Sequence, residues 1–169
     1  MNIIYPDPIS WTWNAVLEVM VDRLEGSRRA KKGNLFELIV RRSLETVFSE
    51  GNLKLSVSDS QVKIGSETYD VVVKGKSGTL LIPVKTRETM GGGHALLFTR
   101  DIHKSIAEAV SAGYPCMPIV IAESWSGDLG KLVCDDFIYL QMNPNQVINI
   151  EPVLVAELRK RTPLFKKLQ

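Results

Sequence analysis

Residues 68–85, with the sequence TYDVVVKGKSGTLLIPVK, decide how the fold is interpreted. Two runs of β-branched and apolar residues stand on either side of Gly75-Lys76-Ser77-Gly78, a turn-forming sequence, and this pattern predicts a β-hairpin. If the strands pair symmetrically about the turn, Asp70 lies opposite Pro83. Lys85 lies two residues beyond Pro83, so we expect Asp70 and Lys85 to share one polar face. The other face is expected to be buried and to carry three apolar side chains: Leu80, Ile82 and Val84.

Asp70 and Lys85 are candidates for a metal-binding and a catalytic role, respectively. A carboxylate in this position can hold a divalent cation, and a neighbouring lysine can orient or deprotonate water or stabilise developing negative charge. The alternative is a surface ion pair, which contributes about 0–1 kcal/mol to stability. Glu37, one turn into a predicted helix before the hairpin, is a second acidic candidate that could reach over the sheet. Its alternative role is an i,i+4 ion pair with Arg41.

The rest of the chain predicts helices and strands around this hairpin. Helices are expected at residues 11–24, 34–48, 101–112 and 152–161. Pro152 fits the first position of the last helix. Further strands are expected at residues 53–57, 61–64, 117–122 and 137–142. Residues 26–33 are interpreted as a basic loop or a helix start. This order predicts an α/β fold: a central mixed β-sheet, made of a β-meander plus further strands, with helices on both faces.

Length and composition indicate one globular domain, residues 1–169. Apolar residues make up 44% and charged residues 24%, and the net charge of +2 excludes a histone-like polycation and an acidic disordered tail. We expect a soluble, cytoplasmic protein without membrane contact, because neither a membrane-spanning run nor a signal sequence is evident. Cys116 and Cys134 are too few for a disulfide scaffold and are expected as reduced thiols in or near the core.

The order of these elements and acidic residues resembles the PD-(D/E)XK nuclease superfamily, which includes many Type II restriction endonucleases. The matching residues are Glu37 in the first core helix, Asp70 as the first acid of the motif, and Pro83-Val84-Lys85 in the place of its (D/E)-x-Lys. The resemblance covers roughly residues 31–123. The expected organisation is an N-terminal helical extension, a catalytic core and a C-terminal strand and helix, at residues 1–30, 31–123 and 124–169.

The resemblance implies a restriction-endonuclease-like fold and a Mg²⁺-dependent endonuclease acting on duplex DNA, with Mn²⁺ able to replace Mg²⁺. By position, Asp70 and the backbone carbonyl of Val84 would bind the metal, and Lys85 would position the attacking water. Double-stranded DNA is the expected partner. A homodimer would match palindromic sites by symmetry, and the apolar helix at residues 11–24 is a candidate interface. An RNA-directed nuclease of the same fold is a further alternative.

One departure from the family pattern is Pro83, which stands in the position of the second acid and has no carboxylate. Either another carboxylate replaces that acid, or the protein is a catalytically inactive DNA-binding or assembly module. Glu37 is the first choice as replacement, because it matches a helical acid of the family. The weaker candidates are Glu67, Glu88 and Asp101. Asp101 has an alternative role as a helix N-cap, and Pro83 itself predicts a bend in its strand.

Residues 86–101, TRETMGGGHALLFTRD, contain three consecutive glycines that would let the backbone approach phosphates closely. Their spacing is neither that of a P-loop nor that of a dinucleotide site, so no nucleotide cofactor is expected. In the resembled family, the loop after the lysine strand commonly faces DNA. The alternative is an ordinary surface loop. The residues expected to contact DNA are Arg87, His94, Arg100, Lys31 and Lys32.

The small net charge conceals an uneven distribution. Residues 28–42 carry six basic and one acidic residue, residues 70–104 six and three, and residues 151–169 five and two. The remaining 100 residues hold a net charge of −9. Two of the three basic segments flank the proposed site, which is the pattern expected of a duplex-binding face.

Overall fold

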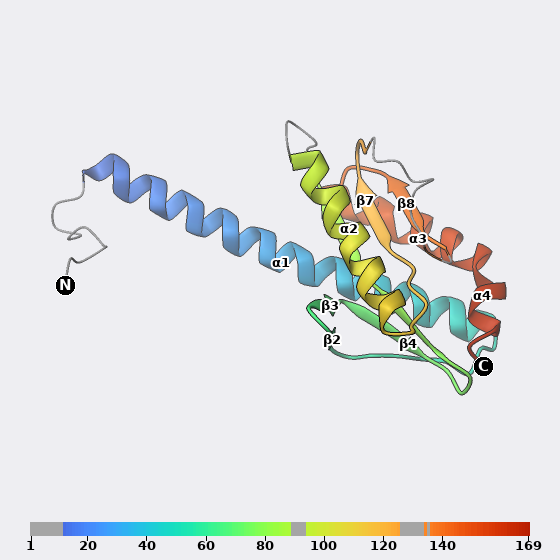
Figure 1. Cartoon of the computed structure of the whole chain (residues 1–169). Helices are drawn as coiled ribbons and strands as arrows, with labels where there is room; N and C mark the ends of the chain where they lie inside the picture. Colours follow the sequence, from blue (N-terminus) through green and yellow to red (C-terminus); the bar gives the residue numbers. More distant parts are fainter. Residues whose placement is uncertain (1–11, 89–93, 126–133, 135) are drawn as a thin grey trace. The chain divides into compact units, whose positions relative to one another are not determined.

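The computed structural model (Figure 1) describes residues 12–88, 94–125, 134 and 136–169. The chain divides into two compact units, Met1–Leu35 and Phe36–Gln169, and each is described by itself. Helix α1 (Trp13–Glu50) contributes residues to both units. The organisation expected from the sequence, one domain with an extension and a catalytic core, stays a prediction.

After α1, the described residues of the second unit form eight strands and three helices. The strands are β1 (Ser56–Val57), β2 (Val62–Ile64), β3 (Glu67–Tyr69), β4 (Val71–Lys74), β5 (Thr79–Ile82), β6 (Val84–Arg87), β7 (Ile119–Ala122) and β8 (Ile138–Gln141). The helices are α2 (His94–Ser111), α3 (Val147–Lys160) and α4 (Thr162–Lys166). Over the ranges given above, no helix has the length and apolar character needed to cross a bilayer.

Antiparallel and parallel strand pairs both occur in the second unit, and the predicted α/β fold is confirmed. Strands β1, β4 and β5 form an antiparallel sheet, and β6, β7 and β8 form a parallel one. Strands β2 and β3 form a separate antiparallel hairpin. The first two sheets follow one another directly along the chain, because only Pro83 separates β5 from β6.

The hairpin within residues 68–85 pairs in the predicted register. Val72 pairs with Leu81, so the pairing is symmetric about the turn and places Asp70 opposite Pro83. The strand predicted to bend at Pro83 changes its pairing partner there. Strand β5 pairs with β4 before this residue, and β6 pairs with β7 after it. Proline lacks a backbone N–H, so the ladder with β4 ends there.

Apolar side chains are buried on both faces of the strands, and helices cover both faces as predicted (Figure 1). One cluster joins α1, α3 and α4 to the strands and includes Phe36, Leu44, Ile82, Leu154 and Phe165. The second cluster joins α2 to the strands and includes Tyr69, Val72, Leu81, Ile102 and Val120. Cys116 belongs to the second cluster and Cys134 packs against it, as expected of thiols in or near the core.

The hairpin face expected to be polar is apolar and buried in its middle, so this part of the prediction was wrong. Val72 and Leu81 lie on the face that Asp70 and Pro83 share, and both are at most 1% exposed because α2 covers them. Both ends of the face are more exposed: Asp70 and Lys85 are partly exposed at one end, and Lys74 is exposed at the other. The candidate site therefore lies at the partly exposed end of this face, where Asp70 and Lys85 are.

Residues 26–33, expected as a basic loop or a helix start, lie in the interior of α1, which is continuous there, so this prediction was also wrong. A glycine in a helix costs only about 1 kcal/mol relative to alanine, and this stretch has two, Gly26 and Gly33. The residues between them are mainly Arg, Lys and Ala, which favour helix.

Helix α2 begins at His94 rather than at residue 101. Phe98 extends the buried stripe of Ile102 and Ile106 by one turn, so the helix starts earlier. Asp101 therefore lies inside α2, and its predicted N-cap role was wrong.

Helix α3 begins at Val147, which places Pro152 inside the helix rather than at its first position. The buried stripe Ile150, Leu154 and Leu158 starts before the proline. Packing of this stripe fixes the first turn, so the helix tolerates the hydrogen bond that Pro152 cannot donate.

The first unit contains the N-terminal part of α1, whose apolar side chains are exposed. Trp13, Leu17, Met20 and Leu24 are separated by four, three and four residues, which places them on one helix face. Each of them is at least 43% exposed. An apolar stripe with this spacing is typical of a helix that packs against another helix.

Arg161 connects the end of α3 to the start of β8 and supports a stability prediction. It is 17% exposed, donates to the carbonyl oxygen of Phe137 at 3.0 Å, and pairs with Asp136 at 3.2 Å and Glu157 at 2.6 Å. Arg161→Ala is expected to lower the free energy of unfolding by about 2 kcal/mol, because it removes charge-assisted hydrogen bonds, leaves Asp136 without its charged partner and leaves Glu157 with Lys160 alone. The expected decrease in Tm is about 4–8 °C.

Lys160→Ala is the matched control for this prediction. Lys160 pairs with the same Glu157, at 2.5 Å, but is 67% exposed. Its replacement is therefore expected to change Tm by no more than about 1–2 °C. Thermal melts of both variants measure the difference, and equal shifts would show that Arg161 is also a solvated surface pair.

Candidate functional site

Asp70 lies at the bend between β3 and β4, and the backbone of β6 holds its carboxylate. Oδ2 accepts a hydrogen bond from the backbone N–H of Val84 at 2.7 Å. This contact follows from the change of partner at Pro83. Since β6 pairs with β7 and not with β4, the N–H of Val84 takes the Asp70 carboxylate as its acceptor. The chain therefore fixes this carboxylate at the start of the lysine strand.

Gln61 links Asp70 to Glu37. Its Nε2 donates to Oε1 of Glu37 at 2.8 Å and lies 3.3 Å from Oδ1 of Asp70, to which it also donates. Glu37 belongs to α1, whereas Gln61 immediately precedes β2. Val62 pairs with Tyr69, so the hairpin register places Gln61 opposite Asp70. Two carboxylates from different elements thus meet around one amide nitrogen.

Arg41, one turn after Glu37 on α1, binds the backbone beside the two carboxylates. Its Nη2 donates to the carbonyl oxygen of Asp70 and lies 3.9 Å from Oε2 of Glu37. The i,i+4 pair considered as the alternative role of Glu37 is therefore present, but it is longer than the bond from Gln61. Glu37 makes both contacts, so the ion pair does not exclude a role at the site.

Burial raises the pKa of both carboxyl groups. For Asp70, the loss of solvent has the largest effect on the pKa, and the hydrogen bond from Val84 and the charge of Lys85 oppose it. For Glu37, burial raises the pKa, the bond from Gln61 lowers it, and the charge of Asp70 raises it. Two partly buried carboxylates that repel each other form a place where a cation lowers the electrostatic energy.

The backbone carbonyl of Val84 faces the same edge of β6 as Asp70. The carbonyl oxygen of Pro83 accepts from the N–H of Ile119 at 3.0 Å, so the backbone groups of Pro83 and Lys85 face β7. Alternate residues of a strand face opposite edges, so both backbone groups of Val84 face away from β7. The N–H of Val84 donates a hydrogen bond to Oδ2 of Asp70, and the carbonyl of Val84 is directed to that same side.

These donors fit a hard divalent cation, because Mg²⁺ and Mn²⁺ prefer carboxylate and carbonyl oxygens. Asp70 and Glu37 would supply carboxylate oxygens and Val84 a carbonyl oxygen. Among the residues whose placement is described, no group of three or more Asp, Glu, His or Cys side chains could hold a metal ion. A cation at this position therefore depends on a mixed set of side-chain and backbone oxygens.

Lys85 is partly buried in β6, and its charge reaches two carboxylates. It lowers the pKa of Asp70, and it makes a minor contribution to the lowered pKa of Glu67. The main cause at Glu67 is the hydrogen bond from Lys104, at 2.6 Å, and Ser105 also donates to Glu67 at 2.9 Å. Lys85 thus lies close enough to Asp70 for its charge to act on that carboxylate, as the sequence predicted.

Among the acids considered as replacements for Pro83, the geometry favours Glu37. It shares the amide of Gln61 with Asp70, whereas Glu67 is bonded to Lys104 and Ser105. The two remaining candidates lie elsewhere: Asp101 is exposed within α2, and Glu88 is exposed after the end of β6. The catalytic and metal-binding roles of Asp70, Lys85, Glu37 and Val84 stay predictions.

The residues expected to contact DNA are distributed over α1, β6 and α2. Arg87 lies in β6 with its guanidinium carbon 5.6 Å from the centroid of the Phe98 ring, a cation–π contact. Arg100 is exposed on α2. The side chains of the other three, His94, Lys31 and Lys32, lie outside the described residues. DNA contact by all five stays a prediction.

Gln61 was missed in the sequence interpretation, although the sequence contains a signal for its position. Residues 61–64 were expected as a strand but were not paired with residues 67–69. Gly65, with a φ of 58°, forms a two-residue connection with Ser66 between these strands. Symmetric pairing about this connection places Gln61 opposite Asp70. Gln61 is neutral, so its residue type by itself does not indicate a metal site; its position beside two carboxylates does.

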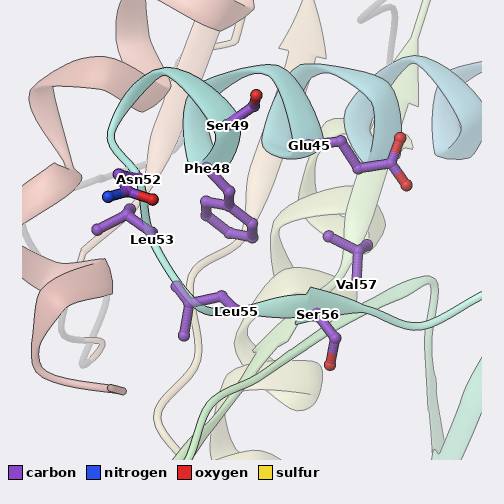
Figure 2. A pocket seen from close by; sticks show the side chains of 8 residues that line it. All are labelled: Glu45, Phe48, Ser49, Asn52, Leu53, Leu55, Ser56 and Val57. Carbon is purple, nitrogen blue, oxygen red and sulfur yellow. The ribbon is translucent and has the colours of Figure 1, made fainter.

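A surface hollow at the end of α1 lies apart from this group of residues (Figure 2). Figure 2 shows the Phe48 ring directed from α1 towards the segment that carries Leu55 and Val57. Its lining consists of Glu45, Phe48, Ser49, Asn52, Leu53, Leu55, Ser56 and Val57. Glu45 is the one ionisable side chain among them, so the hollow does not assemble a set of groups for catalysis.

Comparison with known proteins identifies no family for this chain. No protein-family model and no curated protein matches it. A solved structure with some likeness is SfsA from Pyrococcus furiosus in complex with Ca²⁺, at 11% sequence identity and a TM-score of 0.34. The match covers 76% of this chain and 53% of SfsA. This similarity is too low to assign a function to the chain, so the site is interpreted from its own residues alone.

Proposed function

We propose that this protein is a Mg²⁺-dependent endonuclease of the restriction-endonuclease type, which hydrolyses phosphodiester bonds of duplex DNA. The observation that carries the proposal is the meeting of Glu37 and Asp70 around the amide of Gln61, at the start of the strand that contains Lys85. The resemblance of the sequence to PD-(D/E)XK nucleases implies a carboxylate pair beside such a lysine. Glu37 replaces the acid absent at Pro83, and Mn²⁺ can replace Mg²⁺.

In this proposal, the side chains hold the reactants in place. Asp70, Glu37 and the carbonyl of Val84 bind the cation, which when bound stabilises negative charge at the phosphate. The N–H of Val84 keeps Asp70 oriented, so one peptide unit supports the site through both its polar groups. Lys85 donates a hydrogen bond to the attacking water and orients it towards phosphorus.

The residues proposed to contact DNA are Arg87, Arg100, His94, Lys31 and Lys32. Lysine and arginine contacts to phosphate would supply affinity without sequence preference. Arg87 is stacked on Phe98, so its guanidinium is pre-organised and would lose little conformational entropy on binding. The proposal therefore expects DNA affinity to decrease with increasing salt concentration.

A plasmid-nicking assay tests the proposed function. With Mg²⁺ or Mn²⁺, the wild-type protein is expected to convert supercoiled plasmid to nicked and linear forms, and EDTA is expected to stop the reaction. Asp70→Asn protein purified in parallel controls for contaminating nuclease. Wild-type protein that is inert with both metals but still retards duplex DNA in a gel would contradict the proposal.

Pro83 favours the second candidate function, a catalytically inactive DNA-binding or assembly module. Proline supplies no side-chain ligand, and the strand changes partner there. The nicking assay separates the two functions, because a binding module would retard DNA without cutting it. Cleavage of RNA but not of DNA in the same assay would change the proposed substrate.

We also propose a homodimer formed through the exposed stripe of α1. Trp13, Leu17, Met20 and Leu24 have the alternating four- and three-residue spacing used in helix–helix pairing. Light scattering coupled to size-exclusion chromatography is expected to give about twice the chain mass of 18.9 kDa. The double variant Leu17→Glu, Met20→Glu is expected to be monomeric, because it places negative charges in the apolar stripe that would pack against the second copy.

Glu18→Gln is the matched control for the dimer, since Glu18 is exposed on the same helix and outside the stripe. It is expected to remain dimeric. A monomeric wild-type protein at micromolar concentration would contradict the proposed dimer and would leave the nuclease proposal to its own test.

A further inference from the structure

The amide of Gln61 stands between the two carboxylates of the proposed metal site. Its Nε2 donates to one oxygen of each, at 2.8 Å for Glu37 and 3.3 Å for Asp70. Only the amino side of a glutamine amide can face two ionised carboxylates, because these groups are acceptors alone. The amide therefore supplies partial positive charge where the two negative groups converge.

A cation bound by both carboxylates requires a different orientation of this amide. Mg²⁺ binds oxygen ligands at about 2.0–2.1 Å, and an N–H group directed at a cation is repelled. The same amide carries Oε1, a carbonyl oxygen of the type that Mg²⁺ and Mn²⁺ accept. Rotation about the terminal torsion of glutamine is broad and has a low barrier, so exchange of Nε2 for Oε1 needs no movement of the backbone.

The backbone position of Gln61 is fixed although its side chain is exposed. It precedes β2, which pairs with β3, and Val62 and Ile64 pack against the cluster beneath α2. The β2–β3 hairpin therefore presents Gln61 to Asp70 from a defined position, while the exposed amide is held by its two hydrogen bonds to the carboxylates, which a bound cation would replace. This combination is what a ligand that changes orientation requires.

We propose that Gln61 is a further ligand of the divalent cation through Oε1, beside Glu37, which replaces the acid absent at Pro83. This inference rests on the proposed function, because it assumes that Asp70 and Glu37 bind a cation. Its donor set is two carboxylates, one amide oxygen and the carbonyl of Val84. Gln61 is thus a neutral ligand. It is supplied by the hairpin of β2 and β3, and not by the strand that carries Pro83 and Lys85.

A different role for Gln61 makes the opposite prediction. If the amide only relieves the repulsion between Glu37 and Asp70 in the cation-free protein, it competes with the metal. Its removal would then strengthen metal binding, because nothing would need to be displaced. The sign of the change in affinity therefore separates a ligand from a bridge.

The experiment measures Mn²⁺ binding without DNA, by calorimetry and by the loss of the free Mn²⁺ signal in electron paramagnetic resonance. Gln61→Leu is expected to weaken Mn²⁺ binding about tenfold, at the low end for the loss of a group that supports a metal. Water-proton relaxation is expected to show one more Mn²⁺-bound water in this variant. Gln61→Glu is expected to bind Mn²⁺ at least as tightly as the wild type, because it retains an oxygen ligand.

Gln141→Leu, at an exposed glutamine of β8, is the matched control and is expected to bind as the wild type does. Thermal melts check that all variants fold. Gln61→Leu protein with unchanged or tighter Mn²⁺ binding would overturn the inference while leaving the metal site intact. Wild-type protein that binds no Mn²⁺ would overturn both the inference and the proposed function. Tight binding without cleavage would contradict the nuclease alone.

Discussion

Replacing Lys85 by methionine is expected to lower the rate of DNA cleavage by about 10²- to 10⁴-fold, the range for losing a group that orients or transfers a proton. Methionine fits irregular, partly buried positions, so the variant is expected to fold. Mn²⁺ affinity is expected to be unchanged or slightly higher, because Lys85 supplies no ligand atom and its charge opposes that of the cation. Single-turnover cleavage of a labelled duplex at saturating Mn²⁺ measures the effect.

Lys104→Met is the matched control for Lys85. Lys104 is nearer to Glu67, at 2.6 Å, but it is exposed on α2 and belongs to no step of the proposed reaction. Its replacement is expected to change the cleavage rate by no more than about twofold, as for most surface positions. If both variants lose activity equally, positive charge near Glu67 matters and the orientation of water by Lys85 does not.

The relative positions of Asp70, Pro83 and Lys85 could be predicted because they depend on local geometry. A short turn fixes the register of a hairpin, and the period of two along a strand fixes which side chains share a face. Pro83 itself predicted a bend in its strand. Local geometry could not predict which strand β6 joins afterwards, because that depends on β7, more than 30 residues further along the chain.

The composition of the site beyond those residues depends on contacts distant in sequence. Glu37 meets Asp70 because α1 packs against one face of the strands, and no local pattern sets that alignment. Burial of the second face depends on α2, whose early start was set by one additional buried residue, Phe98. Gln61 could have been placed from the turn at Gly65, but its role becomes evident only beside Glu37.

The other large effect is expected from Asp70→Asn. Loss of a carboxylate ligand is expected to weaken Mn²⁺ binding by about 10²-fold or more, since even groups that only support ligands contribute about 10- to 100-fold. Cleavage is expected to be lost with it. The asparagine Oδ1 can still accept the bond from the N–H of Val84, so the bend at the start of β6 is expected to persist.

The same variant is expected to be more stable than the wild type when no metal is present. Burial raises the pKa of Asp70 above its ordinary value, so the folded state favours the neutral acid. The stability that the neutral acid contributes is fully present below the unfolded-state pKa and is lost as the pH rises through the folded-state pKa. Asparagine stays neutral throughout. Its advantage in Tm is therefore expected at pH 7–8, about 1–3 °C, and should vanish towards pH 4.

Divalent cation is expected to reverse this order. At about 100 times its dissociation constant, a ligand of the folded state adds about 2.7 kcal/mol, which is about 5–10 °C in Tm for a chain of this length. The wild type should gain this increment with Mn²⁺ and Asp70→Asn should not, so the two melting curves exchange places. Asp59→Asn, at an exposed aspartate before β2, should follow the wild type in both conditions. A purely structural Asp70 would give no exchange, because its carboxylate would then serve only its hydrogen bonds from Val84 and Gln61 and would be indifferent to the metal.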